Sequence, residues 1–185
     1  ERARIVNERD IYSVTIYQCE KDYLPQLIPE SANLFELNLL AKRLSELDDW
    51  QRDCFEGLVA RDSVETGREP IRLERLINMT YGTDDCQIAY SVRDDRALGA
   101  FYLENAFYDD RLTGLSEEMI EMLDTEKLGQ RSRSDEGGVF TPGGYVIPGD
   151  IRQIYSSDNI PYPQKPDYVF ALDIAKLPEA DEENT

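Results

Sequence analysis

Helix-starting residues recur along this chain of 185 residues, and each is followed by only a short run of helical periodicity. Asn, Ser and Asp side chains accept hydrogen bonds from the free N–H groups at the start of a helix, which makes them the preferred N-caps. The predicted N-caps are Asn33, Asp48 or Asp49, Asp94 or Asp95, Ser116 and Asp124. Because these caps are closely spaced, the sequence favours short helices that pack as small modules.

The first half of the sequence predicts one strand followed by three helices. Residues Ile11–Tyr17 alternate with period two, which is typical of a strand. Asn33 with Glu36 three residues later has the pattern of a capping box. The third helix is expected to run from Pro70, at a first-turn position, to Met79. The predicted buried stripes of the three helices are Leu37, Leu40, Ala41, Leu44 and Leu47; Cys54, Phe55, Leu58 and Val59; and Leu73, Leu76 and Ile77.

The second half mixes helices with strands. Glycines between short β-branched and aromatic runs predict a hairpin that pairs residues 137–141 with 145–147. Further strands are expected at Cys86–Val92, Ile151–Tyr155 and Tyr168–Ala175. The expected helices follow Asp94 or Asp95 as far as Leu103, Ser116 as far as Leu123, and Asp124 as far as Gln130.

These patterns predict the α+β class. A small helical domain over residues 31–82 is expected to precede a mixed helix and antiparallel-sheet domain over residues 83–178. A polar tail, residues 179–185, follows. Because the chain opens on Glu1 without an initiator Met, we expect it to be a fragment of a longer protein or a processed one.

Carboxylates dominate the charge of the chain. Asp and Glu number 38 against 20 Lys and Arg, there is no histidine, and the net charge is −18. Charge of this sign repels nucleic acid and anionic membranes and attracts basic surfaces. A hydrophobic content of 41% is too high for a disordered chain. Three scattered cysteines and the lack of any apolar run near ~18 residues favour a reducing, cytoplasmic location.

Most catalytic chemistries have no support in this sequence. The absence of histidine excludes Ser/His/Asp and Cys/His nucleophile systems. Acids that are adjacent in sequence do not face each other on a helix, and most of them fit helix caps or turns. No calcium-loop, metal-ligand or phosphate-loop motif occurs. We therefore expect a protein that is not an enzyme, with no catalytic residue, no cofactor and no metal.

The acids themselves then become the candidate binding residues. Helical acids three or four residues apart place their carboxylates on one face, with roughly 5–6 Å between Cβ atoms. Asp49, Asp53 and Glu56 have this spacing, as do Glu117 and Glu121. The full candidate set comprises Glu46, Asp48, Asp49, Asp53, Glu56, Asp84, Asp85, Asp94, Asp95, Asp109, Asp110, Glu117, Glu118 and Glu121.

Three stretches, taken in order, resemble the ArdA antirestriction proteins of conjugative plasmids and transposons. They are Leu37–Leu47, a Leu-Asn followed by spaced Leu and acids; Leu98–Asn105, a Leu-Gly-x-aromatic-Tyr-x-x-Glu pattern; and Leu123–Gly129, followed by Gly143–Val146. Members of that family usually open with a small α/β domain. Only the end of such a unit fits before Pro29, so residues 1–30 are expected to be a partial N-terminal α/β segment.

The resemblance implies an elongated bacterial protein of small domains in series, commonly a homodimer, whose surface carboxylates imitate DNA phosphates. Such a protein binds the methyltransferase core of type I restriction–modification enzymes in place of duplex DNA. It needs no membrane and makes no direct contact with nucleic acid.

Two other functions remain open at this point. The first is a non-inhibitory interaction or accessory domain of a mobile-element protein, which would be acidic for solubility. Acids interspersed with Arg would favour that function, whereas one continuous stripe of acids would favour mimicry. The second is a carboxylate- or metal-dependent hydrolase, which needs four or more acids that converge in one pocket.

Overall fold

The computed structural model describes residues 11–17, 19, 21–67, 70–105, 107 and 114–159. Within them, six α-helices and two small antiparallel sheets form an α+β fold, which confirms the predicted class. The helices are α1 (Leu34–Glu46), α2 (Asp49–Thr66), α3 (Leu73–Tyr81), α4 (Asp95–Glu104), α5 (Glu117–Glu121) and α6 (Thr125–Glu136), with 3₁₀ turns η1 (Thr83–Asp85) and η2 (Ser157–Asn159). The strands are β1 (Ile11–Ser13), β2 (Ser31–Asn33), β3 (Gln87–Ala89), β4 (Val139–Phe140) and β5 (Tyr145–Ile147).

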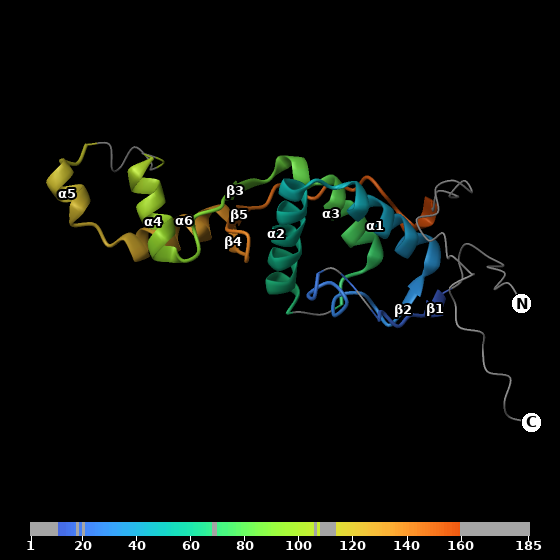
Figure 1. Ribbon diagram of the computed structural model, residues 1–185. Coiled ribbons are helices and arrows are strands. Elements are labelled where there is room, and N and C mark those ends of the chain that lie inside the picture. The colour runs from blue at the N-terminus through green and yellow to red at the C-terminus, as the bar shows by residue number, and fades with distance from the viewer. Residues whose placement is uncertain are drawn as a thin grey trace, which may run out of the picture.

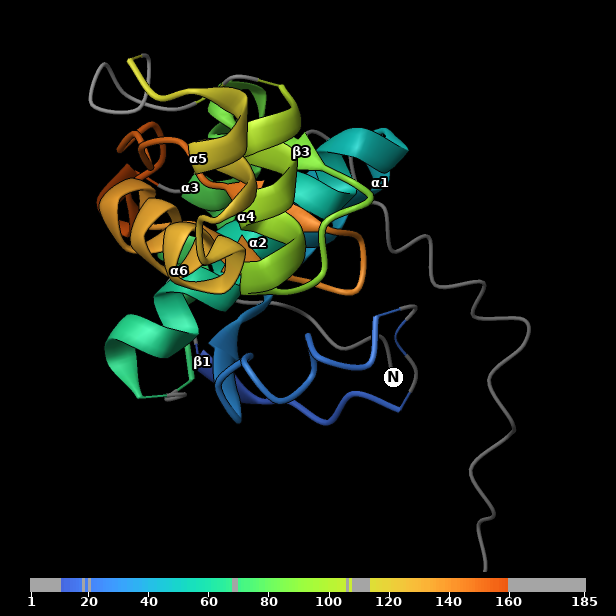
Figure 2. The ribbon, with the colours of Figure 1, turned by 90° about the vertical axis from the view of Figure 1, so that its left-hand side faces the viewer.

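These elements follow one another along an elongated molecule. Figure 1 shows β1, β2, α1 and α3 on one side of α2, and the small sheet followed by α4, α6 and α5 on its other side. The view along the long axis places α4, α5 and α6 in front of the helices of the first half (Figure 2). In the described part of the chain, none of the helices combines the length and apolarity needed to cross a membrane.

The helices of the first half begin close to the predicted caps. The Asn33 side chain accepts hydrogen bonds from the backbone N–H groups of Phe35 and Glu36. Asp48 caps α2 in a reciprocal capping box with Gln51. The expected start of the third helix at Pro70 is wrong, because α3 begins at Leu73 after Arg72. The backbone before α3 binds the N-terminal segment instead of continuing the helix, since the N–H group of Ile71 donates to the Leu27 carbonyl at 2.8 Å.

The N-terminal strand is shorter than predicted. Only Ile11–Ser13 pairs with β2, antiparallel, and Val14 adds one further bond to the Glu30 carbonyl. The side chains from Ile11 to Tyr17 nevertheless alternate between exposed and half-buried. The period-two pattern therefore predicted the alternation of faces correctly but not how far the ladder extends.

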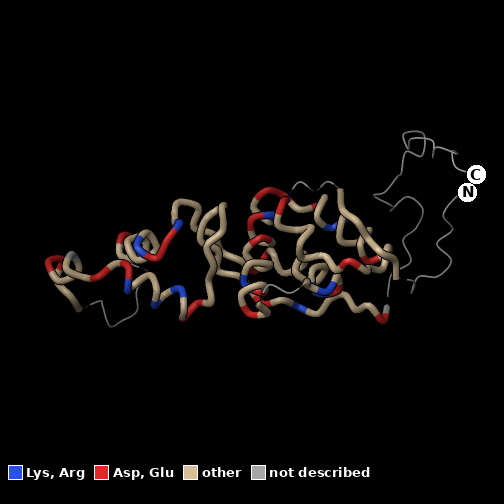
Figure 3. The backbone as a smooth tube through the Cα atoms, turned by 90° about the horizontal axis from the view of Figure 1, so that it is seen from below, with Lys and Arg blue, Asp and Glu red and all other residues tan. Residues whose placement is uncertain are grey.

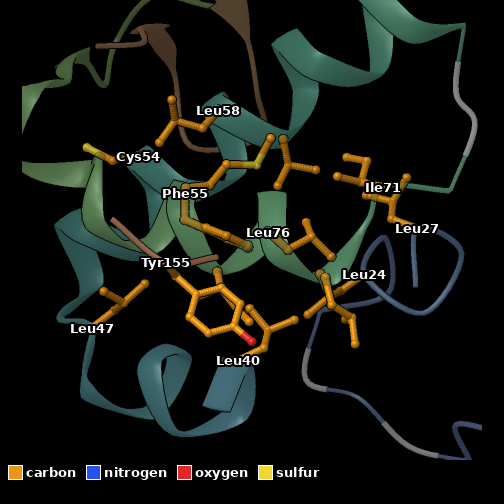
Figure 4. Packing of buried hydrophobic residues seen from close by; sticks show 14 of the residues in the cluster. Leu24, Leu27, Leu40, Leu47, Cys54, Phe55, Leu58, Ile71, Leu76 and Tyr155 are labelled. Carbon is orange, nitrogen blue, oxygen red and sulfur yellow. The ribbon is translucent and has the colours of Figure 1, made fainter. Parts of the chain in front are cut away.

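The main core lies between the helices of the first half. Its buried side chains include Leu40 of α1, Phe55 and Leu58 of α2, and Leu76 of α3. Tyr155, from far along the chain, inserts its ring among them (Figure 4). The same cluster contains Leu24, Leu27, Cys86 and Val146, so its residues come from both sides of the predicted domain boundaries at 31 and 83.

The predicted strand at Ile151–Tyr155 is wrong, because a side chain takes the place of a neighbouring strand. The Asn78 Oδ1 atom accepts from the backbone N–H groups of Ile154 and Tyr155, at 2.8 and 2.7 Å. Its Nδ2 atom donates to the Tyr155 carbonyl at 2.8 Å. The segment is thus fixed to α3 by a buried amide. The other predicted strand, Tyr168–Ala175, lies outside the described residues.

The second half is built on a close contact between α4 and α6. A Cβ atom at Gly99 would overlap the Thr125 carbonyl group, and one at Gly129 would overlap the Asp95 carbonyl group. α6 is longer than predicted and ends at Glu136 instead of Gln130. Its last turn is held by the Glu136 carboxylate, which accepts the hydroxyl protons of Tyr102 and Tyr145.

The predicted hairpin is confirmed and becomes part of a three-stranded sheet. β5 is the central strand, with β4 and β3 antiparallel on either side. β3 is shorter than the expected Cys86–Val92 and spans Gln87–Ala89. Val146 of β5 packs directly on Gly57 of α2, where any Cβ atom would collide with the valine. This contact joins the sheet to the helices of the first half.

The contact between α4 and α6 yields a stability prediction. Gly99→Ala places a methyl group on the Thr125 backbone, so we expect a loss of about 3 kcal/mol in the free energy of unfolding. Urea denaturation followed by circular dichroism measures it. Gly114→Ala is the matched control, since a Cβ atom there meets nothing within 4 Å. An equal effect of the two substitutions would contradict the close approach of α4 and α6.

Candidate functional site

Two of the candidate carboxylates serve as helix caps. Asp48 accepts from the Gln51 N–H group at 2.8 Å, and Asp94 accepts from the Ala97 N–H group at 2.8 Å. Their positions on exposed helix ends follow directly from the capping preference of aspartate. Both carboxylates are exposed, so capping does not remove them from the surface.

Five further candidates form ion pairs. Figure 3 shows Asp and Glu along the described length, with Lys and Arg between them. The strongest pair joins α4 to α6, where the Arg133 guanidinium donates to both Asp95 oxygens at 2.7 and 3.2 Å. The other pairs are Glu46 with Arg43, Asp49 with Arg52, Glu56 with Lys21, and Asp85 with Arg152. The acids therefore do not form one uninterrupted stripe over the described residues.

Apart from Asp53 on α2 and Asp84 on η1, the remaining candidates fall on α5 or outside the described residues. Glu117 and Glu118 are exposed in the first turn of α5, at the far end of the molecule (Figure 1). Glu121 ends α5, and its side chain lies outside the described part. Asp109 and Asp110 also lie outside it.

One group of candidates does converge, on the first turns of α2. Asp49, Asp53 and Glu56 share one side of the helix by their spacing. Asp84 of η1 lies on another side of α2, because its Oδ1 atom accepts from Gln51 Nε2 at 2.9 Å and residues two apart on a helix do not face each other. We call the group formed by the N-cap Asp48 and by Asp49, Asp53 and Glu56 the α2 acidic face.

The α2 acidic face carries more negative than positive charge. Two of its four carboxylates, Asp49 and Glu56, form ion pairs with Arg52 and Lys21, at 3.4 and 3.8 Å. The Arg52 pair is a weak surface interaction, since Asp49 is fully exposed. The effect of the acids reaches Tyr90, just after β3, whose pKa is raised by desolvation and then by the charges of Asp53 and other residues that include Asp48 and Asp49.

Tyr90 is a site residue that the sequence reasoning missed. Tyr90 is 50% exposed, and its pKa, raised first by desolvation, also responds to the charges of Asp53, Asp48 and Asp49 of the α2 acidic face. The predicted strand Cys86–Val92 contained the signal, because an aromatic residue near the end of a short strand and close to acids in the sequence is a candidate contact. Strand periodicity alone did not separate it from a core residue.

A cleft of about 360 Å³ adjoins the same face of α2. Tyr23 of the N-terminal segment, Glu56 of α2 and Phe140 of β4 line it, together with small and apolar side chains. Burial raises the pKa of Glu56, and the Asp53 charge adds to this while Lys21 lowers it. Burial, followed by the Glu56 charge, also raises the pKa of Tyr23 well above its usual value. No sequence pattern links these three residues, since only the tertiary fold brings them together.

Other reactive groups belong to the core. Cys54 and Cys86 are buried, and Cys86 Sγ donates to the Gly82 carbonyl at 3.6 Å while it accepts from the Gly149 N–H group at 3.5 Å. Among the described residues, no group of three or more Cys, Asp or Glu side chains is placed to hold a metal ion. The chemistry that the described acids offer is the binding of cations and basic surfaces.

The pKa of Glu56 makes stability depend on pH. An unfolded glutamate has a pKa of about 4.3, and the folded value is higher, so folding favours the protonated form. Stability from this group is therefore lost as the pH rises from about 4.3 through the raised pKa. We expect Glu56→Gln to be more stable than the parent at pH 7 and equal to it below about pH 4.

Urea midpoints at the two pH values measure this difference. Glu65→Gln is the control, because Glu65 is an exposed glutamate on the same helix. A Glu56→Gln variant that is less stable than the parent at pH 7 would show that the Lys21 pair outweighs the cost of burial.

Comparison with known proteins adds no relative to this description. No protein-family model matches the chain, and neither a curated protein nor a solved structure matches it. The functional argument therefore rests on the geometry of the acids.

Proposed function

We propose that this chain is an acidic binding protein that occupies the DNA-binding surface of a type I restriction–modification enzyme. It inhibits the enzyme by competing with duplex DNA and performs no catalysis itself. Its partner is the basic surface of the methyltransferase core, and its place of action is the cytoplasm. The observation that supports this proposal most is the α2 acidic face.

The spacing of that face suits a surface built to hold DNA. Duplex DNA carries about one charge per ~1.7 Å of its axis, counting both strands, and an enzyme that binds it presents Lys and Arg along a channel. Asp49 and Asp53 lie one helical turn apart, roughly 5–6 Å between Cβ atoms. Opposite charge on the two partners steers their encounter and selects the partner.

The ion pairs elsewhere narrow the proposed contact surface. Around α4 and α6, Asp95 is paired with Arg133, Glu126 with Arg96 and Asp135 with Arg131. Acids that alternate with cations in this way imitate a polyanion poorly. We therefore assign the main contact to the α2 acidic face and give the α4–α6 half a supporting role.

The same ion pairs favour the second candidate function, a non-inhibitory interaction domain whose acids maintain solubility. The two functions differ in one respect. Solubility depends on the number of acids, whereas competition with DNA depends on where they lie.

A matched pair of double variants separates the two functions. Asp49→Asn with Asp53→Asn removes two charges from the α2 acidic face, and Glu126→Gln with Asp135→Asn removes two charges from the α4–α6 half. We expect the first pair to weaken competition with duplex DNA for a purified type I methyltransferase at least about tenfold, since each charge-assisted contact contributes about 1.5–3 kcal/mol. The second pair is expected to change it less than about threefold.

Competition is measured by displacement of fluorescent duplex DNA from the methyltransferase, and circular dichroism verifies the fold of each variant. Equal loss from both pairs would contradict the assignment to the α2 acidic face. A parent protein that displaces no DNA would contradict antirestriction activity toward that enzyme and leave the interaction domain as the better function.

A further inference from the structure

We infer that the cleft beside the α2 acidic face is a binding site for an arginine side chain of a basic protein partner. The cleft is formed by the N-terminal segment, α2 and the turn after β4. Its volume of about 360 Å³ lies within the range of sites for small ligands, about 300–1,000 Å³. The inference names the chemistry of the partner and rests on the proposed function only for the identity of that partner.

A half-buried carboxylate lies in the wall of the cleft. The Glu56 side chain is only 15% exposed, and its ion-pair partner Lys21 lies 3.8 Å away at a half-exposed position. A largely buried carboxylate whose cation lies as far as 3.8 Å away is incompletely compensated, so a positive group that approaches more closely is favoured there. The contact with Lys21 shows that a cation can approach the Glu56 carboxylate. Because the N–O distance of this pair is as long as 3.8 Å, an arginine can displace the lysine.

Aromatic and apolar walls distinguish arginine from lysine as the occupant. Tyr23 and Phe140 present rings, and Leu27, Val59 and Pro142 present apolar surface. A guanidinium stacks on aromatic rings and is more weakly hydrated than an ammonium, while the arginine stem covers apolar walls. Tyr23, which lines the cleft with Glu56, also carries a hydroxyl oxygen that can accept from guanidinium N–H groups.

The ring of Phe140 already takes part in one such contact. The Arg133 guanidinium lies 5.6 Å from the centre of that ring, within cation–π range. The charge of Arg133 is compensated by its two bonds to Asp95. It therefore opposes an incoming cation less than an unpaired arginine would.

Charge complementarity extends beyond the cleft. Asp53 lies one turn before Glu56 on α2, and its carboxylate borders Gly143 in the turn that continues from Pro142. An arginine that enters the cleft thus passes the α2 acidic face, which attracts it from solution.

The test is a titration of the full chain, followed by amide NMR shifts of Ala60, Ser63 and Thr141 around the cleft. The probes are N-acetyl-arginine methylamide, its lysine counterpart, and the uncharged isostere N-acetyl-citrulline methylamide. We expect saturable shifts with the arginine probe and at least about tenfold weaker binding of the other two.

The variants locate the site. Glu56→Gln is expected to lose about tenfold in affinity for the arginine probe, and Glu65→Gln, on the same helix but outside the cleft, is expected to lose none. Equal binding of the arginine and lysine probes, or shifts that miss the cleft, would overturn the inference. If no probe binds in the cleft but the protein still displaces DNA from the methyltransferase, the arginine site is wrong and the proposed function stands. If the arginine probe binds but no DNA is displaced, the proposed function is wrong and the arginine site stands.

Discussion

The contact between Gly57 and Val146 is the point on which both halves of the molecule depend. α2 is buried on one side in the main core, and at Gly57 it admits a strand residue where any other side chain would collide. Val146 is the centre of the small sheet, and its neighbour Tyr145 belongs to the second core with Leu98 and Tyr102. The acidic face of α2 is therefore carried by a helix whose backbone is fixed on one side by the main core and at Gly57 by the sheet.

The carboxylates of this protein have two roles, one in the fold and one at the surface. Some are used by the fold: Asp48 and Asp94 cap helices, Asp95 binds Arg133, and the buried Asp62 binds Arg75. Others remain at the surface, among them Asp49 at the start of α2 and Glu117 and Glu118 on α5. The net charge of −18 therefore overstates the surface that can imitate DNA, because ion pairs reduce its effect in the α4–α6 half.

Local chemistry in the sequence predicted five of the six helix starts, the α+β class and the hairpin, because caps and turns depend on residues a few positions apart. Features that depend on distant residues were missed or wrong. The last turn of α6 depends on Glu136 and two tyrosines, and the extended segment at Ile154 and Tyr155 depends on Asn78. The candidate site shows the same division: the spacing of Asp49, Asp53 and Glu56 was visible in the sequence, whereas the cleft with Tyr23 and Phe140 arises only from folding.

Competition through the α2 acidic face is tested most directly by the salt dependence of binding to the methyltransferase. Exposed charges are screened over about 10 Å at 0.1 M salt, so an interface held by carboxylates and basic side chains weakens as salt is added. We predict that the affinity falls at least about tenfold between roughly 50 and 200 mM salt, and that the Asp49→Asn, Asp53→Asn variant has a shallower dependence. An affinity that stays constant over this range, or equal salt dependence of the parent and the variant, would contradict electrostatic competition by this face.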